Sequence, residues 1–98
     1  MATFAECSSF LVECYWPGVS REKLLELTDR AAKATEELRR SGRDVSLLES
    51  ILVLKDETVF CIFSGCERDV RIVSARAGVP LERIVESVRV PGGRKEQQ

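Results

Sequence analysis

Histidine is absent from the 98 residues of this chain. Its absence removes the commonest transition-metal ligand and the usual general base at neutral pH, which excludes zincin sites and Ser–His–Asp triads. Aromatic residues make up only 6% of the chain, and the 15 lysines and arginines nearly balance the 16 aspartates and glutamates. Because no basic stripe interleaved with aromatics exists, we expect no nucleic-acid partner.

No apolar run reaches the length of a membrane-spanning helix, and the first ten residues, MATFAECSSF, lack the basic and long apolar regions of a secretion signal. We therefore expect a cytoplasmic protein with no membrane partner. The length predicts one domain, which we place at residues 9–91, with flexible termini at 1–8 and 92–98.

The chain holds four cysteines, Cys7, Cys14, Cys61 and Cys66, and none of them forms a C-x-x-C pair. Without a secretion signal we interpret them as reduced thiols. Cys14 and Cys61 fall within strand patterns, where cysteine commonly acts as a small buried apolar side chain. The alternative is a thiolate site for a soft metal such as copper(I) or zinc, which requires all four sulfurs to converge. We predict no metal site.

The most apolar stretch runs from Val45 to Ser64, VSLLESILVLKDETVFCIFS, and is typical of a β-hairpin around a polar connection at residues 55–58. Strict alternation divides its apolar residues between two faces. In the first strand, one face has Leu48, Leu52 and Leu54 and the other has Leu47, Ile51 and Val53. In the second strand, one face has Val59, Cys61 and Phe63 and the other has Phe60 and Ile62. Strands that are apolar on both faces need cover on both.

The remaining segments alternate between strand and helix patterns. Residues 9–15 are strand-like and end at Trp16-Pro17-Gly18. We expect Ser20 to cap a helix over residues 20–41, which carries one apolar stripe and ends before Gly42. A shorter helix is predicted over residues 67–77, followed by a helical turn at residues 80–83 and a last strand at 84–90.

The predicted order of elements is βαββαβ. Two split β-α-β units with right-handed crossovers produce a four-stranded antiparallel sheet in spatial order 4-1-3-2, with both helices on one face. This is the α+β ferredoxin-like fold. The face without helices would carry one apolar set of the hairpin, and an exposed apolar patch of that kind usually marks an interface. We therefore expect a homodimer of the dimeric α/β-barrel type, joined through the sheets.

Three segments carry a resemblance to a known family: FLVECYWPG at residues 10–18, LKDETVFCIFSG at 54–65 and ARAGVPLERIVESVRV at 75–90. Over residues 10–90 the chain resembles a family of small ferredoxin-like proteins, a domain of unknown function named for a nickel-binding member. The resemblance implies a dimer of ferredoxin-like subunits joined through their sheets. Relatives often place a histidine before the alanine of the third motif, where this chain has Ser74 before Ala75. A histidine-ligated nickel site therefore does not carry over.

Carboxylates on the predicted strands are the candidate functional groups: Glu13 on the first, Glu49 on the second and Glu86 on the last. A carboxylate buried between two sheets has a raised pKa and suits acid–base chemistry. Tyr15 shares the alternation of Glu13, so our candidate ligand-binding residues are Glu13, Tyr15 and Glu49, and we assign no catalytic residue. The alternative is that these carboxylates are solvated or paired with an arginine, such as Arg89 with Glu13.

Two functions stay open at this point. The preferred one is a non-enzymatic dimeric module whose sheet–sheet cavity binds a small molecule or only forms the interface. The other is a cofactor-independent enzyme, of oxygenase or isomerase type, that uses Glu13, Glu49 and Tyr15 around a pocket. Because this fold supports many functions, only a closed pocket with convergent polar groups distinguishes them. In both cases we expect no bound cofactor.

Overall fold

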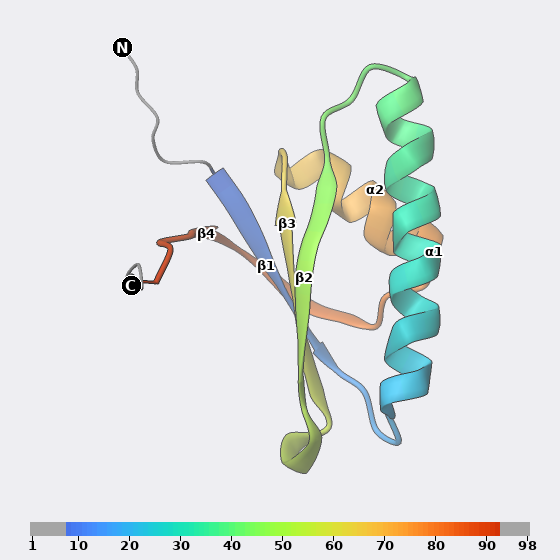
Figure 1. The fold of residues 1–98 in the computed structure, drawn as a ribbon, viewed down its shortest axis with the longest axis vertical. Helices are drawn as coiled ribbons and strands as arrows, with labels where there is room; N and C mark the ends of the chain where they lie inside the picture. Colours follow the sequence, from blue (N-terminus) through green and yellow to red (C-terminus); the bar gives the residue numbers. More distant parts are fainter. Residues whose placement is uncertain (1–7, 93–98) are drawn as a thin grey trace, which may run out of the picture.

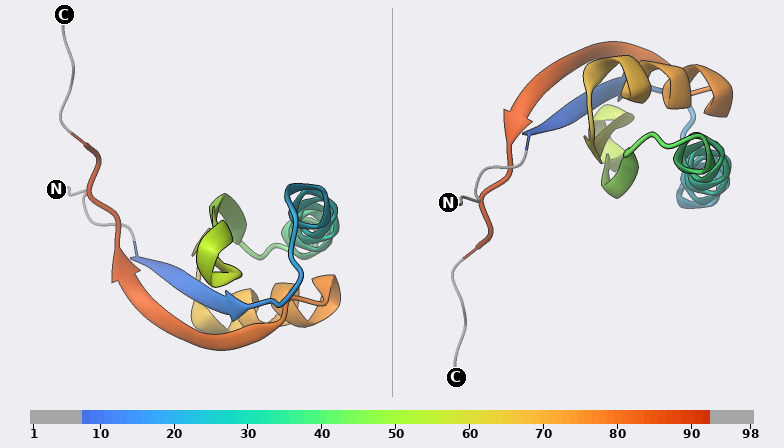
Figure 2. Two further views of the ribbon diagram at one scale, coloured as in Figure 1. Left: turned by 90° about the horizontal axis from the view of Figure 1, so that it is seen from below. Right: turned by 90° about the horizontal axis from the view of Figure 1, so that it is seen from above.

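The computed structural model describes residues 8–92 and has the predicted order of elements (Figure 1). The elements are β1 (Ser8–Tyr15), α1 (Arg21–Arg40), β2 (Ser46–Val53), the 3₁₀ turn η1 (Leu54–Asp56), β3 (Thr58–Ser64), α2 (Glu67–Ala77) and β4 (Leu81–Val88). The sheet is antiparallel in the order β2-β3-β1-β4, as predicted. Both helices pack on the same side of this twisted sheet (Figure 2). The arrangement is consistent with a ferredoxin-like fold.

The predicted flexible termini fall mainly on residues 1–7 and 93–98, which lie outside the described residues. Within the described part, β1 begins one residue earlier than predicted and β4 ends at Val88. Neither helix combines the length and apolar composition that crossing a bilayer requires.

Local sequence sets the ends of both helices. The Ser20 hydroxyl accepts a hydrogen bond from the Lys23 amide at 3.1 Å, which satisfies one of the free amides at the start of α1. Gly42 has a φ of 90° just after the end of α1, and Gly78 has a φ of 74° at the end of α2. Both are left-handed conformations that glycine adopts without a steric penalty, so each helix ends where the sequence predicts.

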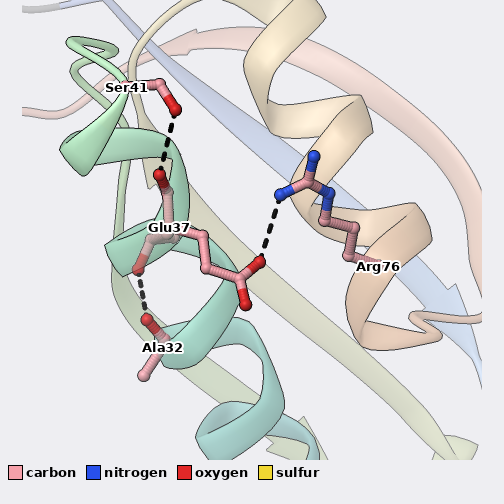
Figure 3. A network of polar contacts seen from close by, with 5 residues as sticks. Ala32, Glu37, Ser41 and Arg76 are labelled. Atoms are coloured by element: carbon pink, nitrogen blue, oxygen red, sulfur yellow. Dashed lines mark hydrogen bonds and ion pairs between the residues drawn. The ribbon is translucent and has the colours of Figure 1, made fainter.

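Polar contacts join the two helices to each other. The Arg76 guanidinium of α2 donates to the Glu37 carboxylate of α1 at 3.1 Å (Figure 3). Within the end of α1 itself, the Ser41 hydroxyl donates to the Glu37 carbonyl at 3.2 Å (Figure 3). Arg30 Nε of α1 donates to the carbonyl of Ala77, the last residue of α2, at 2.8 Å. Carbonyls at a helix C-terminus lack intrahelical partners, so the Arg30 contact satisfies one of them.

The core lies between the helices and the side of the sheet that faces them, which we call the inner face. It is made of apolar side chains that are almost completely buried, among them Val12, Leu27, Val59, Phe63 and Val73. Leu27 belongs to the predicted apolar stripe of α1 and Val59 and Phe63 to the second hairpin strand, while β1 and α2 supply the other two. Trp16 packs against the edge of this core.

A partly buried ion pair holds the loop between α1 and β2 against α2. Arg43 donates to the Asp69 carboxylate at 2.5 Å, and only 8% of the Asp69 side chain is exposed. Beside it, a Cβ at Gly65 would lie 2.8 Å from the Asp44 carbonyl oxygen, and the φ of Gly65 is 123°. Only glycine therefore fits at this close approach of the two loops.

The predicted division of β2 into two faces is wrong. The pairing of β2 with β3 shifts between Leu47 and Glu49, because Leu48 is an extra residue in a β-bulge. The bulge exchanges the faces in mid-strand, so Leu47 and Leu52 both pack against the core although their numbers differ in parity. Ile51 faces away from the core and is 46% exposed.

The predicted helical turn at residues 80–83 is also wrong, and the predicted last strand starts too late. Leu81 opens β4 and pairs with Cys14, while Arg83 pairs with Glu13. The register between the two strands shifts between Glu13 and Cys14. Pairing with β1 satisfies more backbone groups than one isolated helical turn, which has no hydrogen-bonded continuation.

Candidate functional site

The open face, which we define as the side of the sheet away from both helices, has an apolar centre. Two neighbouring rows of residues cross it from β2 to β4. They consist of Glu49, Ile62, Leu11 and Val85 in one row, and Ile51, Phe60, Glu13 and Arg83 in the next. Apart from the exposed Ile51, the apolar members of both rows are half-buried. The centre of the open face therefore presents large apolar side chains that the described chain covers only in part.

A row of serines bounds this apolar centre at one end. Ser46, Ser64, Ser9 and Ser87 are in register across all four strands. The Ser9 hydroxyl donates to the Ser87 carbonyl at 3.0 Å, and Arg39 of α1 reaches the Ser46 hydroxyl at 3.5 Å. At the other end stand Thr58 and Tyr15. An apolar centre with a polar rim is the usual anatomy of a protein–protein interface.

The open face also holds a shallow depression of about 350 Å³. Its lining consists of Leu11, Glu49, Ile62, Ser87, Val88, Arg89 and Val90. Residues 89–92 continue beyond β4 on the side of the sheet away from the helices (Figure 1), which places the Arg89 segment beside this face. The depression combines an apolar floor with one carboxylate and one guanidinium, a combination that suits a small polar molecule with an apolar part.

Glu13 is engaged by an arginine, as the second interpretation of the carboxylates expects, but the arginine is Arg83 and not Arg89. Arg83 Nε lies 2.8 Å from the Glu13 carboxylate, and the two residues are directly opposite each other on β1 and β4. The side chains are 69% and 35% exposed, respectively, so solvent screens the pair. Arg89 follows the end of β4 and lines the depression instead.

The three candidate ligand-binding residues share the open face but do not meet in one pocket. Only Glu49 lines the depression. Glu13 lies two strands away, about 10 Å across the sheet, because β3 separates β1 from β2. Tyr15 is 54% exposed at the far end of β1. Glu86 pairs with Phe10, an inner-face residue, so it lies on the opposite side of the sheet from Glu13.

The sequence interpretation missed Arg83 as the partner of Glu13. It placed residue 83 in a helical turn, and a helical turn offers no cross-strand neighbour. The signal that was available is the alternation of Arg83, Val85 and Ser87 with Ile84 and the other inner-face residues. That alternation breaks before Leu81, which packs against the core although it has the same parity as Arg83. The pairing of Arg83 with Glu13 therefore depends on the register between β1 and β4, which the alternation does not supply.

Cys14 and Cys61 are buried on the inner face, as predicted, and Cys66 is exposed at the start of α2. Cys7 lies outside the described residues. Among residues 8–92, no three histidine, cysteine, aspartate or glutamate side chains are grouped so that they could hold a metal ion. Ser74 on α2 is 3% exposed, and its hydroxyl has no hydrogen-bond partner within the described chain.

Comparisons with known proteins identify the fold alone. No protein-family model and no curated protein matches the chain. Among solved structures, the chain is similar to SCO4226 from Streptomyces coelicolor A3(2), with a TM-score of 0.60, 19% identity, and coverage of 88% of this chain and 99% of that one. A further match is At3g17210 from Arabidopsis thaliana, with a TM-score of 0.42, 16% identity, and coverage of 92% and 99%. The first of these supports the ferredoxin-like architecture.

Proposed function

We propose that the chain is a homodimeric ferredoxin-like binding module, non-enzymatic, in which two copies pack through their open faces. The observation that carries this proposal is the apolar centre of the open face, where Ile51 is 46% exposed beside the half-buried Phe60 and Ile62. Burying such a surface gains roughly 25 cal/mol per Å² of apolar area. A second copy presents a face of the same composition, so a two-fold axis pairs the apolar centres and brings polar rims together.

The same packing would close the depression near Glu49 and Arg89 into a cavity between the two sheets. A small molecule with an anionic or cationic group and an apolar part suits such a cavity. The alternative of a cofactor-independent enzyme needs Glu13, Glu49 and Tyr15 around one pocket. Two observations favour the binding module: these three side chains do not share the depression, and Arg83 engages the Glu13 carboxylate. If the chain belongs to the family that it resembles, its lack of histidine favours a member without the histidine-ligated nickel site.

Sedimentation velocity at micromolar concentration tests the dimer. We expect a mass near twice the 11.0 kDa of the chain. Ile51→Lys places a charge at the apolar centre, where desolvation would be costly, and should give a monomer with an unchanged circular dichroism spectrum. Leu25→Lys is the matched control, because Leu25 is 58% exposed on α1, on the other side of the sheet, and this variant should remain a dimer.

A wild-type chain that sediments as a monomer at these concentrations would contradict the dimer. An Ile51→Lys dimer as stable as the wild type would show that another surface forms the interface. Native mass spectrometry of protein purified without a tag from its own cell tests the binding role, since a bound small molecule should appear as an added mass. Calorimetric titration with nickel should show no submicromolar site, because imidazole is absent and carboxylates alone hold nickel weakly.

A further inference from the structure

A groove of about 330 Å³ lies on the helix-covered side of the sheet, between α1 and the edge strand β2. Because α1 and β2 run in opposite directions (Figure 1), the groove joins the first turns of the helix to the end of the strand. Its volume falls within the range of small-molecule sites, roughly 300–1,000 Å³. Its lining consists of Arg21, Leu24, Leu25, Ser50, Leu52 and Leu54.

A small residue between two large ones leaves space for this groove. Leu47 and Leu52 of β2 pack against the core, whereas Ser50, opposite Cys61 on the same face, fills much less volume. Because β2 is at the edge of the sheet, the space beside Ser50 opens to the side of the molecule. The Ser50 hydroxyl donates to Cys61 Sγ at 3.5 Å, so its proton is already used within the sheet. The floor of the groove therefore has little free hydrogen-bonding capacity.

The walls of the groove are apolar and partly in water. Leu25 and Leu54 are 58% and 70% exposed, whereas Leu24 is 9% exposed and belongs to the core. An aliphatic chain lying between these side chains would remove leucine surface from water, which is the main driving force for binding apolar groups. The groove thus suits a ligand with an unbranched apolar part.

Arg21 is the single charged residue in the lining. Within residues 8–92, no carboxylate forms an ion pair with its guanidinium. The positive end of the α1 dipole adds to its charge, and Glu22 in the same turn does not line the groove. Three further depressions on the described chain are each lined by both carboxylates and cations. The groove at Arg21 differs from them because it is complementary to an anion next to an apolar chain.

We propose that this groove binds an aliphatic carboxylate, a fatty acid of short or medium chain length, with its carboxylate on Arg21 and its chain along the leucines. The planar guanidinium presents two parallel N–H donors that match the two oxygens of a carboxylate. The site lies on the opposite side of the sheet from the cavity proposed between two open faces. It therefore requires neither that cavity nor the dimer.

Calorimetric titration of the tag-free full chain with hexanoate, octanoate and decanoate tests the proposal. Each added methylene should tighten binding roughly fourfold, or about 16-fold from octanoate to decanoate, because each is buried between the leucines. Decyltrimethylammonium carries a cation on the same chain and should bind more weakly than decanoate. Equal binding of the two would show that Arg21 does not recognise the head group.

Arg21→Gln should weaken decanoate binding about 10- to 100-fold, the range expected when a charge-assisted hydrogen bond is lost, and should leave 1-decanol binding unchanged. Lys33→Gln is the matched control, because it removes an exposed cation further along α1, and it should bind decanoate as the wild type does. Ser50→Leu fills the floor of the groove and should abolish binding. Leu54→Asp should do the same by placing an anion at an exposed position of the lining, so it decides if Ser50→Leu does not fold.

Amide chemical shifts then locate the bound decanoate. In the Ile51→Lys variant, decanoate should shift the amides of residues 21–25 and 50–54 and leave those of residues 85–90 unchanged. Because Ile51→Lys disrupts the proposed dimer, binding in this variant is tested separately from the dimer.

No saturable decanoate binding, unchanged affinity in Arg21→Gln, or shifts confined to the open face would overturn the proposal. Groove amides that shift with protein concentration alone would show that a second copy of the chain occupies the groove, which would overturn it as well.

Discussion

The inner and open faces of the sheet are built from the same four strands, yet they are covered very differently. On the inner face, side chains such as Val12, Val59 and Phe63 are at most 1% exposed beneath the two helices. On the open face, their strand neighbours Phe60 and Ile62 stay half-buried, and Ile51 is nearly half exposed. Period-two alternation makes both sets apolar, so the difference comes from what packs against them and not from the strands.

Two carboxylate–arginine pairs differ in their surroundings in the same way, one beside the inner face and one on the open face. Asp69 and Arg43 form theirs at the edge of the core, where the carboxylate is 8% exposed. Glu13 and Arg83 form theirs on the open face at 2.8 Å, with the guanidinium 69% exposed. Similar short contacts therefore have different energetic weight, because solvent screens the open pair more than the pair whose carboxylate is buried.

The largest expected effect is on the inner face. Phe63→Ala should lower the free energy of unfolding by about 3–5 kcal/mol, since it leaves a cavity in a closely packed core. Phe60→Ala on the same strand is the matched control and should cost about 1 kcal/mol, because its ring is already partly in water. Urea unfolding of both changes in the Ile51→Lys background removes any contribution from dimer formation. Equal costs would mean that the two faces do not differ in packing.

An intermediate effect should separate the two ion pairs. Arg43→Ala should cost about 3 kcal/mol, because it leaves the Asp69 carboxylate buried without its partner. Arg83→Ala should cost less than about 1 kcal/mol, because water solvates Glu13 once the arginine is removed. The measurement is again urea unfolding, repeated at high salt, where only the small Arg83 effect should fade. A larger cost for Arg83→Ala would assign a structural role to the open-face pair.

The smallest effect concerns the candidate ligand-binding residues. Glu13→Gln should change the melting temperature by no more than about 4 °C, a shift that corresponds to roughly 0.5 kcal/mol in a domain of this size. Glu49→Gln should have an equally small effect. A metabolite fraction that stabilises the wild type should still stabilise Glu13→Gln and should fail with Glu49→Gln, because only Glu49 lines the depression. If the fraction stabilises Glu49→Gln but fails with Glu13→Gln, the ligand binds at Glu13 instead.

The sequence alone was enough to predict the structural features that depend on a few consecutive residues. The Ser20 cap, the apolar stripe of α1, and Gly42 and Gly78 at the helix ends all act within one or two helical turns. Element order and strand alternation in β3 are also local, and with the handedness of crossovers they were enough to predict the sheet order β2-β3-β1-β4. The burial of Cys14 and Cys61 followed from the same alternation.

Features that depend on register were decided only by the tertiary structure. The bulge at Leu48 exchanges the faces of β2, and nothing in the local pattern of leucines and isoleucines distinguishes a bulged strand from a regular one. Pairing along β1 turns Leu81–Arg83 into strand and places Arg83 beside Glu13. The same register places Cys14 and Cys61, 47 positions apart in the chain, at diagonal positions on neighbouring strands. Register is set by the sum of many cross-strand contacts, so one extra residue moves every later side chain to the other face.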